Sequence, residues 1–241
     1  MLKFMIKGGI MNNKDVFELT NPQRNIWNME EYFKDTTINN ICTSVLLDEM
    51  INVKLLKQAI NNIVKKNDSF RISLYRENGI PKQKILDFIP FDIEVINVNT
   101  KKEMSEIEKS EANIKFDILK SNLFRFKIIM FPNNIGGIIL TVHHMIADSW
   151  SLGLTVKNLI KEYHSLLNNT KITENEQSYI NYIESETQYK NSIKFQNDKQ
   201  FWENTFKDIP SQVSIPSTKK LQKHISCTAK RSSFSINKSI I

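Results

Sequence analysis

Hydrophobic and polar residues follow two periods along the chain, one typical of strands and one typical of helices. Apolar and polar positions alternate in Ile41–Leu47 and Phe124–Phe131, and a nearly continuous apolar run with β-branched residues covers Ile138–Val142. Apolar residues recur every three or four positions in Val53–Val64 and in Leu152–Leu167. The pattern therefore predicts a globular protein in which strands are interspersed with helices.

Turn and capping residues delimit further elements. Asn78-Gly79 is the strongest hairpin signal in the sequence, and we expect a strand on each side of it. Thr20 or Asn21 followed by Pro22 is typical of a helix start. The remaining expected elements, in chain order, are a short strand at Phe17–Leu19, a strand at 91–98, a helix at Lys101–Ile114 and one or two helices in 177–206.

Residues 138–151 join a predicted strand to a predicted helix through a turn that contains two histidines and an aspartate. Side chains alternate across a strand, so we expect His144 to share a face with Leu140 and Val142 and His143 to point to the opposite face. Only one of the two imidazoles then faces a given cleft.

These residue types suit proton transfer. A histidine side chain can accept or donate a proton near neutral pH, and Asp148 can orient the imidazole or anchor the turn. One alternative is that the same polar groups only cap the end of the strand. A metal site is the weakest interpretation, because neighbouring strand histidines diverge and neither Cys42, Cys227 nor the histidine spacing supplies the remaining ligands. We therefore predict no metal and favour a catalytic histidine.

Residues 143–149, His-His-Met-Ile-Ala-Asp-Ser, resemble the HHxxxDG motif of condensation domains in nonribosomal peptide synthetases, which share a fold with chloramphenicol acetyltransferase. Three other segments are similar to motifs of this family and follow in the family's order. Leu19–Trp27 is similar to the opening motif with its Gln-Arg pair, and Lys66–Leu74 to RHExLRTxF, of which only the arginine is strictly kept. Tyr179–Tyr182 followed by Phe201-Trp202 is similar to the segment after the histidine motif.

The resemblance implies an α/β fold of the α+β two-layer kind, a chloramphenicol acetyltransferase-like lobe with a mixed sheet flanked by helices. We expect a leader at 1–13, an N-terminal condensation-type lobe at 14–176, and at 177–241 a long helix and a crossing segment towards a C-terminal lobe. The motifs of that second lobe are absent from the sequence. The family's substrate tunnel runs between two lobes, so we expect this chain alone to fold but to be weakly active or inactive.

The resemblance also implies a reaction, the formation of an amide bond between an acyl thioester and the amine of an aminoacyl group on a carrier protein. His144, the second histidine of the motif, would be the catalytic residue, and His143 would be structural. Asp148 would point away from the substrate and form a buried ion pair with Arg71, or with Arg24 as the second choice. Removing one partner of such a pair costs about 3–5 kcal/mol.

The residues after the aspartate indicate a subtype. Ser149 stands where the motif has glycine. A serine leaves less space and allows fewer backbone angles than glycine at this position. Ser149 followed by Trp150 is similar to starter condensation domains, which attach a fatty acyl group to the first amino acid, and so is the segment Ile26–Ile41. We also expect no carrier domain ahead of this chain, as in the starter type. Both histidines are retained, which argues against the heterocyclising subtype.

The partners follow from the same resemblance. We expect no tightly bound cofactor, since the substrates arrive on the phosphopantetheine arms of carrier proteins or as acyl-CoA. The expected partners are peptidyl or acyl carrier protein domains and an adenylation domain. Two alternatives stay open: a non-catalytic module that docks carrier proteins, and a freestanding acyltransferase that uses coenzyme A and completes its site across a trimer.

Composition and charge argue against some other classes of protein, namely nucleic acid-binding and membrane proteins. With 241 residues and 40% hydrophobic content, the chain can build a sizeable core. Its net charge of +7 is scattered among asparagines and acidic residues instead of forming one basic stripe, so we expect no nucleic acid partner. No apolar run approaches the roughly 20 residues of a membrane span, and the first ten residues make a poor signal peptide. We therefore expect a cytoplasmic protein without a membrane partner.

Overall fold

The computed structural model describes residues 16–171 and 178–211. The expected leader, residues 172–177 at the expected end of the lobe, and the expected crossing segment beyond 211 lie outside these ranges. The chain divides into two compact units, Met1–Ser192 and Ile193–Ile241.

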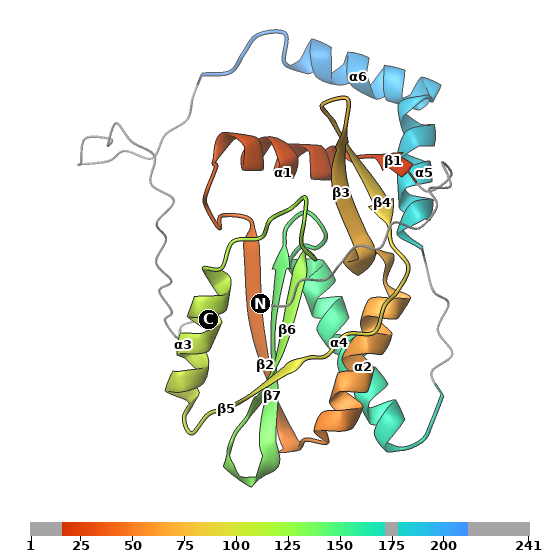
Figure 1. Cartoon of the computed structure of the whole chain (residues 1–241). Coiled ribbons are helices and arrows are strands. Elements are labelled where there is room, and N and C mark those ends of the chain that lie inside the picture. Colours follow the sequence, from red (N-terminus) through yellow and green to blue (C-terminus); the bar gives the residue numbers. More distant parts are fainter. Residues whose placement is uncertain (1–15, 172–177, 212–241) are drawn as a thin grey trace, which may run out of the picture. The chain divides into compact units, whose positions relative to one another are not determined.

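A four-stranded mixed sheet forms the centre of the first unit (Figure 1). Its strands, in spatial order, are β2 (Asn40–Met50), β7 (Ile135–His143), β6 (Phe124–Met130) and β5 (Glu94–Asn97). β7 is antiparallel to both of its neighbours, whereas β5 runs parallel to β6. The mixed sheet flanked by helices that the sequence predicted is confirmed.

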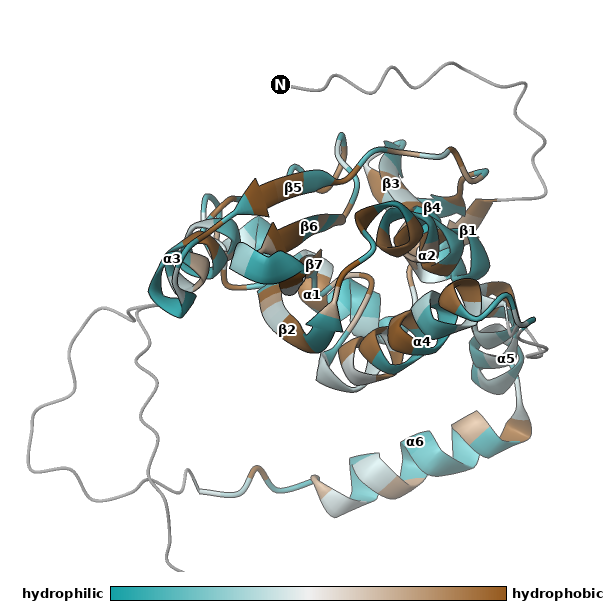
Figure 2. Cartoon of the chain, turned by 90° about the horizontal axis from the view of Figure 1, so that it is seen from below, coloured by the Kyte–Doolittle hydropathy of each residue, from teal (hydrophilic) through white to brown (hydrophobic). Residues whose placement is uncertain are grey.

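Helices cover both faces of this sheet. The helices α2 (Val53–Lys66) and α4 (Ser149–Leu167) pack against each other on one face, and α3 (Lys101–Ala112) covers the other (Figure 2). β6 explains this arrangement, because Ile128 joins the cluster with α2 and α4 while Ile129 joins the cluster with α3. Both side chains are fully buried, and each such burial stabilises the fold by roughly 1.5–3 kcal/mol.

A second, three-stranded sheet lies at the end of the lobe that carries α1 (Asn21–Tyr32). Its order is β1 (Val16–Glu18), β4 (Ile80–Ile85) and β3 (Ile72–Glu77). The turn between β3 and β4 has positive φ at Asn78 (52°) and at Gly79 (82°), as a two-residue hairpin loop requires. The predicted hairpin is confirmed.

The predicted start of α1 is also confirmed, and a capping box explains it. The side chain of Thr20 accepts a hydrogen bond from the backbone N–H of Gln23, the third helical residue, and Gln23 Oε1 accepts one from the backbone N–H of Thr20 at 3.0 Å. Pro22 lies in the first turn, where its missing N–H is not needed.

The helix α5 (Tyr179–Lys190) is tied to the lobe at both ends. At its start, Ser178 Oγ and Tyr179 N donate hydrogen bonds to Asp68 Oδ2. Towards its end, Glu186 Oε1 accepts a hydrogen bond of 2.9 Å from Asn21 N at the start of α1. α5 therefore belongs to the first unit.

The second unit contains α6 (Ile193–Thr205). Trp202 contacts Phe201 edge to face and stacks on Phe206 at interplanar angles of 79° and 12°. The sequence predicted one or two helices in 177–206, and the structure has two, α5 and α6.

A glycine of β7 gives a test of how closely β2 and β7 approach each other. A Cβ at Gly137 would lie 1.9 Å from the backbone oxygen of Val45 in β2, a position that no side chain can occupy without moving the strands. We expect Gly137→Ala to lower the free energy of unfolding by about 1–3 kcal/mol or more, measured by urea denaturation.

The matched control is Gly153 in α4, where an added Cβ meets nothing within 4 Å. Gly153→Ala should raise the free energy of unfolding by up to about 1 kcal/mol, because alanine favours the helix. Equal effects of the two substitutions would contradict the strand spacing described above.

Candidate active site

The two histidines lie where β7 ends and the turn into α4 begins. His143, the last residue of β7, is 2% exposed, whereas His144 is an exposed residue of the turn. The strand alternation expected to place His144 on the face of Leu140 and Val142 does not extend to it, because β7 ends at His143. Helices cover both faces of β7, so His144 reaches the surface because the strand has ended and not through strand alternation.

His143 is held by hydrogen bonds on both ring nitrogens. Its Nδ1 accepts a hydrogen bond from Met145 N at 3.1 Å, and its Nε2 lies 3.2 Å from Glu30 Oε1 on α1. A ring nitrogen that accepts cannot carry a proton, so Nε2 carries it and donates to Glu30. Phe116 packs edge to face against the ring, with centroids 5.9 Å apart.

This environment favours the neutral form of His143. Burial lowers the pKa of the imidazole below its ordinary value of 6.5, and the neighbouring Glu30 carboxylate opposes that shift without cancelling it. His144 adds a small further lowering of this pKa.

His144 is fixed through its backbone. Its own N–H donates to the backbone oxygen of Asn39 at 2.7 Å, and the N–H of the next residue is the one bound by His143. The side chain extends from this fixed backbone as an exposed imidazole that an external group can reach.

Asp148 caps α4 and does not form the expected ion pair. Its Oδ1 accepts hydrogen bonds from Ser151 N at 2.7 Å and from Ser151 Oγ at 2.6 Å. These two bonds hold the pKa of the exposed carboxyl below its usual range. The predicted buried pair of Asp148 with Arg71 or Arg24 is therefore wrong, because the carboxylate meets the start of its own helix.

The two arginines lie elsewhere in the lobe. Arg71 pairs with Asp68, three residues earlier, and donates from Nη1 to the backbone oxygen of Leu86 at 2.6 Å. Arg24 makes only an exposed ion pair, in which Nη2 is 3.8 Å from Glu18 Oε2. Since Asp68 also accepts the two hydrogen bonds from the start of α5, Arg71 helps to anchor that helix.

Ser149 and Trp150 begin α4. Ser149 is not among the described residues with positive φ, so serine meets no backbone strain in place of the motif's glycine. The side chain of Trp150 is 78% exposed, close in the chain to His144. Both residues thus lie at the surface where the turn enters the helix.

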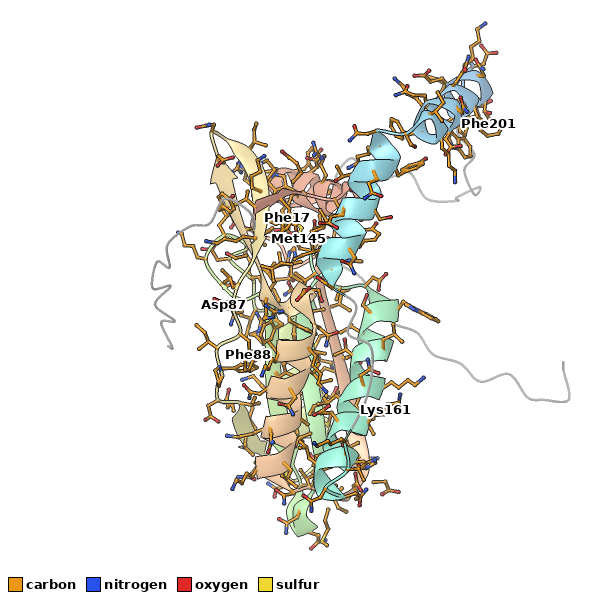
Figure 3. The ribbon with its side chains drawn as sticks, turned by 90° about the vertical axis from the view of Figure 1, so that its right-hand side faces the viewer. Phe17, Asp87, Phe88, Met145, Lys161 and Phe201 are labelled. Atoms are coloured by element: carbon orange, nitrogen blue, oxygen red, sulfur yellow. The ribbon has the colours of Figure 1, made fainter. Side chains whose placement is uncertain are left out.

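Four buried or half-buried polar residues of this region were not predicted as site residues. Glu30 and Asn39 contact the histidine pair, while Gln23 and Gln83 exchange amide hydrogen bonds of 2.8 and 2.7 Å. Gln23 Nε2 also donates to the backbone oxygen of Met145 at 3.4 Å. Figure 3 shows Met145 at the same end of the lobe as Phe17. Gln23 and Glu30, with Trp27 between them, recur at helical spacing on the inner face of α1, and this pattern was the available signal.

The described ranges contain neither a metal cluster nor a membrane span. In residues 16–171 and 178–211, no group of three or more histidine, cysteine, aspartate or glutamate side chains is arranged to hold a metal ion. None of the helices described there has the length and apolar character needed to cross a bilayer.

The sequence profile of the condensation-domain family matches residues 13–240. The chain belongs to the condensation-domain family. The turn with His143, His144 and Asp148 lies within the matched residues.

Curated relatives of this condensation-domain chain are much longer. It is 28% identical over 207 residues to surfactin synthase subunit 1 of Bacillus subtilis (strain 168), which is 83% of this chain and 6% of that protein. It is 28% identical over 216 residues to a plipastatin synthase of the same organism, which is 88% of this chain and 8% of that protein.

Solved structures agree with the fold. A variant of the starter condensation domain of the rhizomide synthetase RzmA superimposes with a TM-score of 0.77 at 15% identity, over 83% of this chain and 50% of that chain. Related variants of that domain contain C8-CoA (TM-score 0.75) or C8-CoA with Leu-SNAC (TM-score 0.74). The chain thus spans about half the length of these condensation domains.

The cap at Asp148 predicts a modest stability effect. Asp148→Ala should lower the free energy of unfolding by about 0.5–2 kcal/mol, as loss of a helix cap does, and Asp148→Asn by less. The effect should add to that of Arg71→Ala in the double variant, because the two side chains do not pair. Urea denaturation of the parent protein and of these four variants measures the effects. A loss of about 3–5 kcal/mol for Asp148→Ala, coupled to Arg71, would indicate the buried ion pair instead.

His143 predicts a loss of stability in acid. Its pKa is lower in the folded protein than the value of 6.5 that applies to the unfolded chain. The unfolded state therefore binds the proton more readily. The stability that the neutral His143 contributes is fully present above about pH 6.5 and is lost as the pH falls through the folded pKa. His143→Asn should be less stable at pH 7, and its deficit should shrink towards pH 5 at up to about 1.4 kcal/mol per pH unit. Parallel stability curves for the two proteins would exclude this role of His143.

Proposed function

We propose that this chain supplies the histidine-bearing lobe of a condensation domain that forms an amide bond. The nitrogen of an aminoacyl amine attacks the carbonyl carbon of an acyl thioester, a C–N bond forms and the C–S bond breaks. The amine loses one proton and the departing thiolate gains one, so the products are an amide and a free thiol.

His144 carries the catalysis in this proposal. An exposed imidazole whose backbone is fixed on both sides suits a group that orients the amine and takes its proton. A base held in this way contributes roughly 10²–10⁴-fold to a rate. His143 cannot share the task, because both of its ring nitrogens are engaged below the surface.

The acyl donor in this proposal is a fatty acyl-CoA, as in starter condensation domains. The support is the sequence of Ser149 and Trp150 together with the fold shared with a starter domain that binds C8-CoA. The acceptor is an aminoacyl group on the phosphopantetheine arm of a carrier protein, loaded by an adenylation domain, and the reaction takes place in the cytoplasm.

A second lobe is needed for full activity. The chain spans 50% of the starter domain on which it superimposes, and His144 is exposed where a facing wall would enclose a substrate. We call the chain joined at its C-terminus to a second condensation-type lobe the two-lobe protein. The chain alone should form little or no amide.

The decisive substitution is His144→Ala in the two-lobe protein. With C8-CoA and Leu-SNAC as substrates, kcat should fall by about 10²–10⁴-fold while KM changes little, because the amine loses its base. Formation of the amide, followed by mass spectrometry, measures the rate.

The thermal unfolding midpoint serves as the control for this substitution. It should not change, since the imidazole is exposed and both backbone hydrogen bonds beside it persist. A two-lobe protein that keeps its full rate with His144→Ala would disprove the catalytic assignment, and no amide from any acyl-CoA would favour a docking role.

A further inference from the structure

Two backbone N–H groups flank the α-carbon of His144, and each has a buried acceptor. His144 N donates to the backbone oxygen of Asn39 at 2.7 Å, and Met145 N donates to Nδ1 of His143 at 3.1 Å. Peptide groups are planar, so fixing the planes on both sides of a residue fixes the direction of its Cα–Cβ bond. Asn39 and His143, each 2% exposed, therefore set the direction in which the side chain of His144 leaves the backbone.

Both of these residues bind the same atom of Glu30. Asn39 Nδ2 donates to Glu30 Oε1 at 2.6 Å, and His143 Nε2 lies 3.2 Å from that oxygen. The Glu30 side chain is only 11% exposed, so water competes poorly for this position. One carboxylate oxygen thus connects α1 to both of the groups that hold the backbone of His144.

The chemistry of Glu30 decides how its partners are arranged. A carboxylate only accepts hydrogen bonds, so it requires the proton of His143 on Nε2 and leaves Nδ1 free to accept from Met145 N. Without that acceptor the proton can move to Nδ1, where it would face the N–H of Met145 and break the bond. The same oxygen holds the amide of Asn39 with its NH₂ group towards Glu30.

We propose that Glu30 is a positioning residue for the condensation reaction, acting on His144 through the tautomer of His143 and the orientation of Asn39. This inference rests on the proposed function of His144. Glu30 does not touch the reacting atoms in this scheme, so its loss should change kcat and not the binding of either substrate.

The kinetic test uses the two-lobe protein with C8-CoA and Leu-SNAC. Glu30→Ala should lower kcat by about 10- to 100-fold, the usual cost of a small misplacement of a catalytic group, with both KM values within about twofold. Glu30→Gln should restore most of the rate, because its amide oxygen can accept both hydrogen bonds. If Glu30→Ala does not fold, Glu30→Asp replaces it, since the shorter side chain withdraws the oxygen but keeps the charge.

A double substitution separates positioning from a purely structural role. In a His144→Ala background, Glu30→Ala should cause no further fall in kcat, because the group that it positions is gone. The matched control is Glu31→Ala, which removes the adjacent glutamate on α1 and its exposed ion pair with Arg76 and should leave kcat unchanged.

The tautomer of His143 gives a readout that does not depend on activity. Nitrogen-15 NMR of the 241-residue chain should show the proton on Nε2 in the parent protein and in Glu30→Gln, and a shift towards Nδ1 in Glu30→Ala. An unchanged tautomer in Glu30→Ala, or an unchanged kcat, would overturn the inference.

The outcomes also distinguish the two proposals. A full rate with His144→Ala means that the catalytic assignment of His144 is wrong, whatever Glu30 does. A low rate with His144→Ala, together with a further fall when Glu30→Ala is added, leaves the proposed function standing and removes only the role of Glu30.

Discussion

The structure around His144 depends on one constraint: a turn that joins a buried strand to a helix must find acceptors for its backbone N–H groups without water. β7 runs through the core to His143, and α4 begins only six residues later, at Ser149. The chain meets this need with side chains, through the ring of His143 and the carboxylate of Asp148, and with the backbone oxygen of Asn39. The polar residues of this turn are therefore explained in part by the need to bond its backbone N–H groups.

That constraint explains why polar residues are buried at one end of the lobe. Glu30 and Gln23 lie on the inner face of α1, and Gln83 of β4 is fully buried yet exchanges two amide hydrogen bonds with Gln23. A buried polar group costs free energy unless it is bonded, so these side chains are tolerated because they satisfy one another and the turn. α1 contacts the turn through Glu30 and Gln23, and the small sheet supports Gln23 through Gln83.

Much of this arrangement follows from the sequence because it is local. Periodicity located the strands and helices, Asn78-Gly79 located the hairpin, and the histidine motif indicated the family. The partner of Asp148 did not follow, since the choice among Arg71, Arg24 and Ser151 depends on which groups the fold brings near the carboxylate. Glu30 and Asn39 were missed for a related reason: the chain is rich in such residues, and apart from the helical spacing of Glu30 with Gln23, only burial sets these two apart.

The outer side of β2 has a consequence for how copies of this chain meet. Within residues 16–171 and 178–211, β2 pairs with β7 on one side only, so its other side presents backbone groups that a further strand could extend. The register of β2 shifts between Leu47 and Met50, and Asp48 and Glu49 lie at that irregularity. A strand added there would have to straighten the irregularity and approach two carboxylates. This end of the edge is therefore guarded against fibril-like growth of the sheet.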